Sequence, residues 1–228
     1  MKLAKVTRSA ETKRWYDDAC GTALALEFVG ERWALLVMRE LVYGPRRFGE
    51  IKANLPGISA NVLTQRLEGL EASGILTRRR LPSPANVQVY ELTRWGLEAR
   101  PLIRDLGRWA ARSSRHDPML FMSSASAMMS LETLVDRDKA TDADLTIQFR
   151  LPDDQFTVRV RDGALTVTRG GGDAPDVIFT GDTMAVRVSV YGKAPLTRDG
   201  AGGGLMIEGD LAAAQRFVDL FALPEKIA

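Results

Sequence analysis

The sequence of 228 residues contains one cysteine, one histidine and no long apolar run. A single Cys cannot form an intramolecular disulfide, and one Cys with one His cannot make the usual structural zinc site. His116 is the only histidine and lies in the apparent linker between the halves, so a histidine-based triad or general base is not plausible. No apolar stretch approaches the ~20 residues that span a bilayer, and Met1–Glu11 lacks the apolar core of a signal peptide. These absences predict a cytoplasmic protein with no catalytic site, metal, cofactor or membrane partner.

Charge is divided unevenly along the chain, although the net charge is only +2. Residues 1–116 contain 20 Lys and Arg against 12 Asp and Glu, whereas residues 117–228 contain 11 against 17. The hydrophobic content of 45% and charged content of 26% are ordinary for a globular protein. The split suggests that only the basic half meets a polyanion.

Apolar spacing and breaker residues predict the elements of the first half. Ser59 is the expected N-cap of one helix and Gly74 its expected end. Pro82 and Pro84 cannot donate to a strand ladder, so residues 81–86 form a hairpin tip. Residues 1–13 are expected to be an arm or a dimer-embracing segment. We predict helices over 19–29, 33–43, 48–53, 59–73 and 93 to about 113, a turn over 55–58, and strands over 75–80 and 87–92.

The sequence His116-Asp117-Pro118 predicts a boundary between domains covering residues 1–116 and 117–228. Beyond it, stretches that alternate apolar and polar residues indicate strands. Together the two halves predict an α+β fold class, with a small sheet-and-helix domain second. We expect helices over 119–134, 183–190 and 211–221, and strands over 145–150, 156–161, 164–169, 176–180 and 205–208.

The helix over 59–73 separates into two faces on a wheel of ~100° per residue. One face is apolar, and the other carries Asn61, Thr64, Gln65 and Glu68. Asn and Gln can bond adenine edges, and Thr can bond a base or touch a thymine methyl, whereas a merely solvated face more often carries Lys and Glu. The first three of these residues, with Ser59, are therefore candidate DNA contacts, and Glu68 is expected to face solvent.

Cations surround this helix. Arg78, Arg79 and Arg80 run into the hairpin tip, Arg46 and Arg47 precede a short helix, and Arg94 follows the hairpin. They are interpreted as phosphate contacts, and the arginines of the hairpin could also enter the minor groove. The alternative for the hairpin is a solvated strand edge. Arg66 could reach a phosphate or hold a neighbouring carboxylate.

Four segments of the first half are distinctive in combination. They are Glu27-Phe28-Val29-Gly30-Glu31-Arg32-Trp33, Gly44-Pro45-Arg46-Arg47-Phe48, Leu55-Pro56-Gly57-Ile58-Ser59 and Tyr90-Glu91-Leu92-Thr93-Arg94-Trp95-Gly96. With these segments the chain resembles the HxlR family of bacterial winged-helix transcription regulators, which are relatives of the MarR type. The resemblance implies a homodimer built from the first helix and the long helix after the hairpin, a palindromic double-stranded operator, and control of transcription, with repression favoured.

Cys20 matches a position at which some members of that family sense oxidants or electrophiles. Here Gly21 follows it, where the family often has Pro. Cys20 is therefore a candidate redox residue, and the alternative is an inert packed side chain.

The second half resembles a sterol carrier protein-like domain, mainly through Ile207-Glu208-Gly209-Asp210-Leu211 before a final helix. The resemblance implies an apolar tunnel and a hydrophobic small-molecule effector that tunes DNA binding. The alternatives are plain core for each candidate residue and a dimer brace for the domain; Asp210 is interpreted as a helix N-cap. Candidate lining residues are Met128, Phe156, Phe179, Val186, Met206 and Phe217.

Three functions compete for the whole chain. The first is a homodimeric DNA-binding regulator, and the second is a lipid or small-molecule carrier whose first half only dimerises. The charge split favours the regulator, because a carrier has no need of three arginines beside a polar helix face. An enzyme is disfavoured, because the Gly-rich stretch Gly200–Gly204 fits no nucleotide fingerprint and Asp153-Asp154 is interpreted as a turn.

Overall fold

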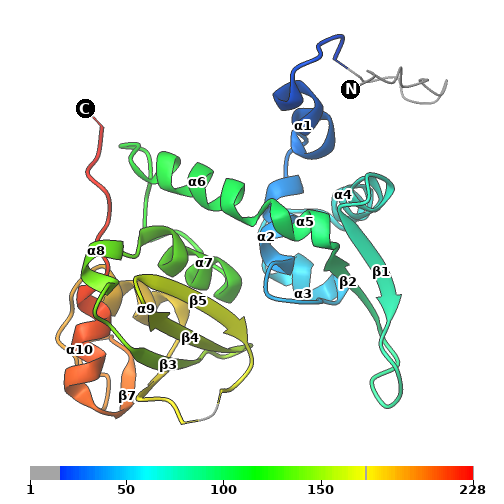
Figure 1. Cartoon of the computed structure of the whole chain (residues 1–228). Helices are drawn as coiled ribbons and strands as arrows, with labels where there is room; N and C mark the ends of the chain where they lie inside the picture. Colours follow the sequence, from blue (N-terminus) through cyan, green and yellow to red (C-terminus); the bar gives the residue numbers. More distant parts are fainter. Residues whose placement is uncertain (1–15, 173, 228) are drawn as a thin grey trace.

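In the computed structural model, which describes residues 16–172 and 174–227, the chain forms two α+β halves side by side (Figure 1). The first half holds a two-stranded sheet and the second a five-stranded sheet. The predicted α+β fold class is confirmed. The arm expected over residues 1–13 lies outside the described residues.

The core of the first half is formed mainly by helices α2 and α4, each of which buries one face. In α2 the side chains of Val37 and Leu41 are buried, and in α4 those of Leu63 and Leu67 are buried, so the two helices share one core. This is the i, i+4 stripe that the spacing predicts. The elements are α1 (Gly21–Val29), α2 (Ala34–Leu41), α3 (Phe48–Ala53), α4 (Ala60–Ala72), β1 (Leu76–Arg80), β2 (Gln88–Leu92), α5 (Arg94–Glu98) and α6 (Arg100–Ala111).

The hairpin, which we call the wing (residues 76–92), is an antiparallel pair in which Leu76 opposes Leu92 and Arg80 opposes Gln88. A third segment joins it, because Arg46 forms an isolated antiparallel bridge with Tyr90. The backbone N–H groups of both residues donate to the partner's carbonyl, at 3.0 Å and 2.8 Å. These two hydrogen bonds join the wing to the loop before α3.

The single long helix predicted after the wing is instead two helices, α5 and α6, which meet at Ala99. Pro101 lies in the first turn of α6. Proline has no N–H and is tolerated only in a first turn, so a new helix begins here. The prediction of one continuous helix was wrong because it weighed apolar spacing above this proline.

The second half folds around one sheet in the order β5-β4-β3-β6-β7, in which only β3 and β6 run parallel. Phe149 lies opposite both Phe156 and Phe179, so three aromatic rings face the same side of the sheet. Helices α7 and α10 pack on the sheet, and α9 contacts both of them. The elements are α7 (Ser124–Leu134), α8 (Arg137–Ala140), β3 (Leu145–Arg150), β4 (Gln155–Arg161), β5 (Ala164–Arg169), β6 (Val177–Thr180), α9 (Thr183–Val190), β7 (Met206–Gly209) and α10 (Leu211–Asp219).

Two details of this half differ from prediction. Helix α7 begins at Ser124 rather than at 119, because the hydroxyl of Ser123 accepts the N–H of Ser126 at 3.1 Å and caps the helix. The short helix α8 was not predicted; Asp136 caps it by accepting from the N–H groups of Asp138 and Lys139. The predicted caps Ser59 and Asp210 are confirmed.

The halves are joined where α7 packs on α2 and α6. The join includes buried polar contacts, since the hydroxyl of Ser123 donates to the Glu40 carboxylate at 2.7 Å. Arg100 forms an ion pair with Glu132, and burial raises the pKa of that carboxyl while the guanidinium opposes the shift. Buried charges are tolerated only when they are paired, so these contacts fix the halves in one arrangement.

Candidate nucleic-acid interface

Helix α4 presents the polar face that the sequence predicts. The side chains of Asn61, Thr64 and Gln65 are exposed, as is Glu68, whereas the opposite face packs into the core. The Thr64 hydroxyl donates to the carbonyl of Ala60 at 3.0 Å, which fixes its rotamer and leaves its lone pairs outward. These groups can donate to and accept from base edges in a major groove.

Helix α3, the turn over residues 54–58 and helix α4 form the helix-turn-helix. Gly57 adopts a φ of +90°, a conformation that favours glycine, and Ile58 is buried below the turn. The Ser59 hydroxyl accepts the N–H of Val62 at 3.2 Å, so the first turn of α4 is capped and remains exposed. The turn therefore places the polar N-terminal part of α4 at the surface.

The wing carries three exposed arginines, each held by a neighbour on the same hairpin or on α4. Arg78 pairs with Glu71 at 2.6 Å, Arg79 pairs with Glu91 at 2.7 Å, and Arg80 donates to the Asn86 side chain at 2.7 Å. The Arg78 guanidinium holds the pKa of Glu71 below its usual range. Exposed pairs of this kind contribute only about 0–1 kcal/mol, so a phosphate can displace the carboxylates.

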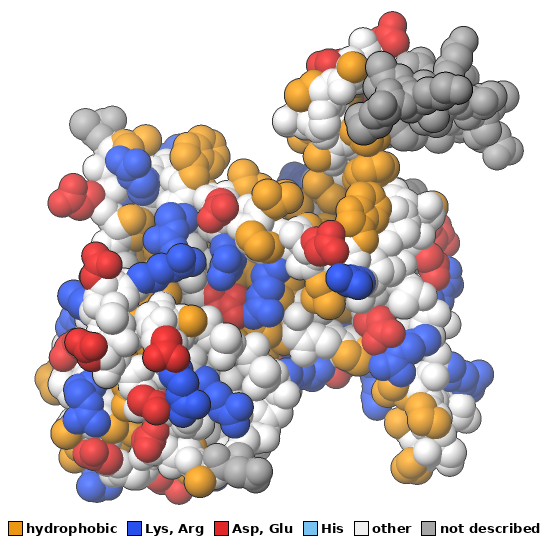
Figure 2. All heavy atoms as spheres, viewed as in Figure 1, with side chains coloured by type: hydrophobic (Ala, Val, Ile, Leu, Met, Phe, Trp, Pro, Cys, Tyr) orange, Lys and Arg blue, Asp and Glu red, His pale blue; other side chains and the backbone are white. Residues whose placement is uncertain are grey.

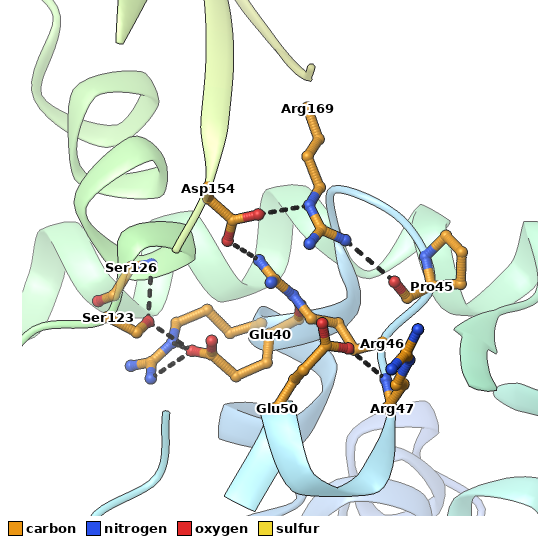
Figure 3. Close-up of polar contacts among 10 residues, drawn as sticks. Glu40, Pro45, Arg46, Arg47, Glu50, Ser123, Ser126, Asp154 and Arg169 are labelled. Atoms are coloured by element: carbon orange, nitrogen blue, oxygen red, sulfur yellow. Dashed lines mark hydrogen bonds and ion pairs between the residues drawn. The ribbon is translucent and has the colours of Figure 1, made fainter. Parts of the chain in front are cut away.

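Arg46 does not fit the predicted phosphate contact. Its side chain is 3% exposed and donates to the Asp154 carboxylate at 2.6 Å and to the carbonyl of Glu40 at 3.3 Å. Arg169 reaches the other oxygen of Asp154, also at 2.6 Å, and donates to the carbonyl of Pro45 (Figure 3). Arg46 therefore joins the two halves. The sequence could not show this, because Asp154 lies 108 positions away.

The three remaining candidate arginines, Arg47, Arg66 and Arg94, differ in how exposed their side chains are. Arg47 is exposed, and its backbone N–H donates to the Glu50 carboxylate. The side chain of Arg94 is 97% exposed, with Glu98 at 3.9 Å. Arg66 lies 3.3 Å from Glu31 and is largely covered, so of its two predicted roles the structure shows the neighbouring carboxylate. Arg47 and Arg94 remain accessible to a phosphate.

The residues predicted to line a ligand tunnel are mostly buried in the core of the second half. Five of them are fully buried, and Phe179 packs against Phe149 and Phe217 with ring centroids 5.3 Å and 6.0 Å apart. Met206 is 52% exposed on β7. Their predicted role as ligand contacts stays a prediction, because a packed core and a lined cavity have the same apolar pattern in sequence. The five buried residues are Met128, Phe156, Phe179, Val186 and Phe217.

Cys20 lies immediately before α1 with an exposed side chain. The backbone N–H of Thr22, followed by its hydroxyl, lowers the pKa of the thiol. The side chain is thus not the packed, inert residue of the alternative interpretation. Its predicted redox role is untested and stays a prediction.

Sequence reasoning missed a cleft of about 340 Å³ between the halves. Helices α2 and α6 line one side of it and α7 and α9 the other. No local signal marks it, because each helix contributes only a few apolar residues that also fit an ordinary core.

Neither a metal-binding cluster nor a membrane-spanning helix occurs in the described part of the chain. Over residues 16–172 and 174–227, no three His, Cys, Asp or Glu side chains are grouped to hold a metal ion. Within the same ranges, every helix is too short or too polar to cross a membrane.

Comparison with known proteins assigns the two halves separately. Residues 28–118 match the family described as HxlR-like helix-turn-helix, and residues 116–227 match the one described as alkyl sulfatase C-terminal. The second match does not confirm the predicted sterol carrier-like domain.

Individual relatives agree on the first half. The uncharacterized HTH-type transcriptional regulator YvaP of Bacillus subtilis is 36% identical over 87 residues, which cover 38% of this chain and 80% of YvaP. HTH-type transcriptional regulator YodB of the same species is 35% identical over 86 residues, covering 38% and 77%. The solved structure of reduced YodB is 31% identical, with a TM-score of 0.39, over 44% of this chain and 100% of that one. Because residues 28–118 match the family model, and YvaP and YodB are more than 30% identical over more than two thirds of their lengths, the chain belongs to the HxlR-like helix-turn-helix family of transcriptional regulators.

Proposed function

We propose that this regulator binds a palindromic operator as a homodimer, reads it with α4 and grips the flanking phosphates with the wing. The observation that carries the proposal is the exposed polar face of α4, with Asn61, Thr64 and Gln65, together with the exposed arginines of β1, the strand that contacts this helix. Recognition helices of this kind enter the major groove, and cationic hairpins contact the backbone beside it. A carrier would have no use for such a face.

The dimer contact that we propose involves α1 and α6, as the resemblance implies. No residue of α1 is buried within the described chain, although Leu24 and Leu26 are apolar. On α6, Leu102 is 62% and Trp109 is 75% exposed. Figure 2 shows hydrophobic side chains gathered along α1 and toward α6. Large exposed apolar patches mark protein contacts, and a two-fold dimer would place two α4 helices in successive major grooves, about 34–36 Å apart.

The sign of regulation that we propose is repression, tuned by a small-molecule effector. A dimer seated on an operator within a promoter excludes polymerase by occupying the same duplex. The effector is proposed because the second half is joined to the first by buried hydrogen bonds of Asp154 with Arg46 and of Ser123 with Glu40. A ligand bound between the halves would therefore contact the half that binds DNA and influence its DNA binding.

The test of this function begins with operators selected from a randomised duplex library and footprinted with the full chain. Gel shifts at several salt concentrations should show a salt-sensitive complex, because each phosphate contact contributes about 0.9 to the slope of log K against log salt. Gln65→Ala should relax the preference at one base pair by about 1–3 kcal/mol.

The double variant Arg79→Ala/Arg80→Ala should weaken binding to every sequence and lower the salt slope. The matched control is Arg159→Ala/Arg161→Ala, which removes two exposed charges from β4 in the other half. Equal affinity of the two double variants at every salt concentration would show that the wing does not contact DNA.

A further inference from the structure

The cleft between the halves has the size and walls of a small-molecule site. Its volume of about 340 Å³ lies at the lower end of the range of such sites, about 300–1,000 Å³. Leu36 of α2 and Leu106 of α6 form part of one wall, and Met129 of α7 part of the other. These side chains are apolar, so the cleft suits a hydrocarbon chain.

The lining of the cleft carries positive charge. Arg187 of α9 lines it, is 7% exposed, and donates to the backbone carbonyls of Thr183, Pro118 and Leu120. Burial lowers the pKa of Arg187, while Asp182 and Asp117 act on it in the opposite direction. Its contacts to described residues are thus to uncharged oxygens. Arg187 makes these contacts with its Nε and Nη1 atoms, so its Nη2 atom is the donor that we assign to a ligand.

The rest of the lining does not neutralise this charge. None of the described residues that line the cleft is Asp or Glu. Arg39, also in the lining, pairs at 2.8 Å with Glu40, whose carboxylate is buried behind it. Hydroxyl groups of Ser130 and Tyr191, 2.8 Å apart, supply neutral polar groups near the apolar wall. Figure 2 shows Lys and Arg side chains below α6, over the seam between the halves.

We propose that this cleft binds an amphipathic organic anion, with the tail between α6 and α7 and the anionic head on Arg187. A guanidinium forms charge-assisted hydrogen bonds with carboxylate or sulfate oxygens, which are about twice as strong as neutral ones. Taking an isolated cation out of water is costly, and an anion offsets that cost. A neutral alcohol would gain only the apolar contact, and a cation would be repelled.

The site also offers a route to regulation, an extension that rests on the proposed function. One face of α6, with Ile103 and Gly107, lines the cleft, while Leu102 and Trp109 of the same helix are exposed. A ligand against α6 thus contacts the helix that we assign to the dimer. By linkage, a ligand shifts the equilibrium toward the arrangement that it binds more tightly.

The test is calorimetric titration of the full chain, without DNA, with decanoate, 1-decanol and decyltrimethylammonium, the two ions below their micellar concentrations and the alcohol below its solubility limit. Decanoate is expected to bind one molecule per chain. The affinity for 1-decanol should be at least about tenfold lower, because a charged hydrogen-bonded contact is lost. The cation should bind more weakly still. Equal affinities for the three probes would overturn the proposal.

Two variants locate the binding. Arg187→Gln should bind decanoate and 1-decanol about equally, because only the charged contact is removed. Gly107→Leu should abolish binding of both, since a Cβ at Gly107 meets open space and a longer side chain would enter the cleft. Gly69→Ala on α4, also open around its Cβ, is the control for a helical glycine and should bind like the parent.

Should Arg187→Gln fail to fold, Gly107→Leu still decides whether the cleft holds the ligand. Unchanged decanoate binding in Gly107→Leu would show that the ligand binds elsewhere and would overturn the proposal. The gel shift is carried out separately. Decanoate binding without DNA binding would count against the proposed function alone, and DNA binding without decanoate binding against the cleft alone.

Discussion

Asp154 is the residue on which the junction between the halves depends most. Its carboxylate is 3% exposed and accepts from Arg46 and from Arg169, each at 2.6 Å. One negative charge thus compensates two guanidinium groups, of which that of Arg46 is as buried as the carboxylate. Removing one member of a buried pair leaves an uncompensated charge in a medium of low polarity.

Asp154→Asn should therefore lower the free energy of unfolding by about 3–5 kcal/mol. The amide can still accept one hydrogen bond, but it carries no charge to balance Arg46. The matched control is Asp144→Asn, which breaks the exposed pair with Arg161 at 2.9 Å and should cost no more than about 1 kcal/mol. Urea denaturation followed by circular dichroism measures both, and similar values for the two variants would contradict the assignment of a buried ionic junction.

At the scale of elements, the close approach of α5 to the start of the wing fixes the course of the chain after β2. Gly96 is buried, and a Cβ built there would lie 2.1 Å from the carbonyl oxygen of Ile75. That same oxygen accepts the N–H of Thr93 at 2.9 Å. The helix can lie this close to the strand only because Gly96 has no side chain.

Gly96→Ala should destabilise the protein by about 1–3 kcal/mol, because backbone atoms must move to admit the methyl group. Gly69→Ala makes the same change inside α4, where nothing lies within 4 Å of the new Cβ. It should stabilise the protein by about 0.5–1 kcal/mol through helix propensity. Thermal melting of the two variants checks the opposite signs, and a neutral Gly96→Ala would exclude the close approach.

At the scale of the whole molecule, two features define how two copies could meet. One is the set of exposed apolar residues on α1 and α6, and the other is the second half, which buried contacts join to the first. Trp109 is the largest of these residues and is 75% exposed. Buried aromatic anchors commonly contribute about 2 kcal/mol or more to an interface. The proposed dimer therefore depends more on Trp109 than on the smaller apolar side chains around it.

Trp109→Glu should raise the dimer dissociation constant at least about 25-fold, since 1.4 kcal/mol corresponds to tenfold. Operator affinity should fall with it, because a monomer contacts one half-site. Met206→Glu, which adds the same charge at another exposed apolar residue on β7, is the control and should remain dimeric. Analytical ultracentrifugation gives both constants, and an unaffected Trp109→Glu dimer would move the contact away from α6.

The sequence by itself determined what depends on neighbours in the chain. The i, i+4 spacing of Leu63 and Leu67 set which face of α4 is buried, and Ser59 set where the helix begins. Prolines placed the tip of the wing between its strands. These signals act over one or two turns, so they can be interpreted without knowing the rest of the fold.

Only the tertiary structure decided which distant segments meet. It turned Arg46 from a candidate phosphate contact into a buried partner of Asp154, and it packed Phe179 against Phe149 and Phe217. It also created a charged cleft at Arg187 from helices of both halves. The physical reason is that burial and ion pairing depend on which surfaces come together when the chain folds. Residues with the same local sequence pattern can therefore be buried in one place and exposed in another.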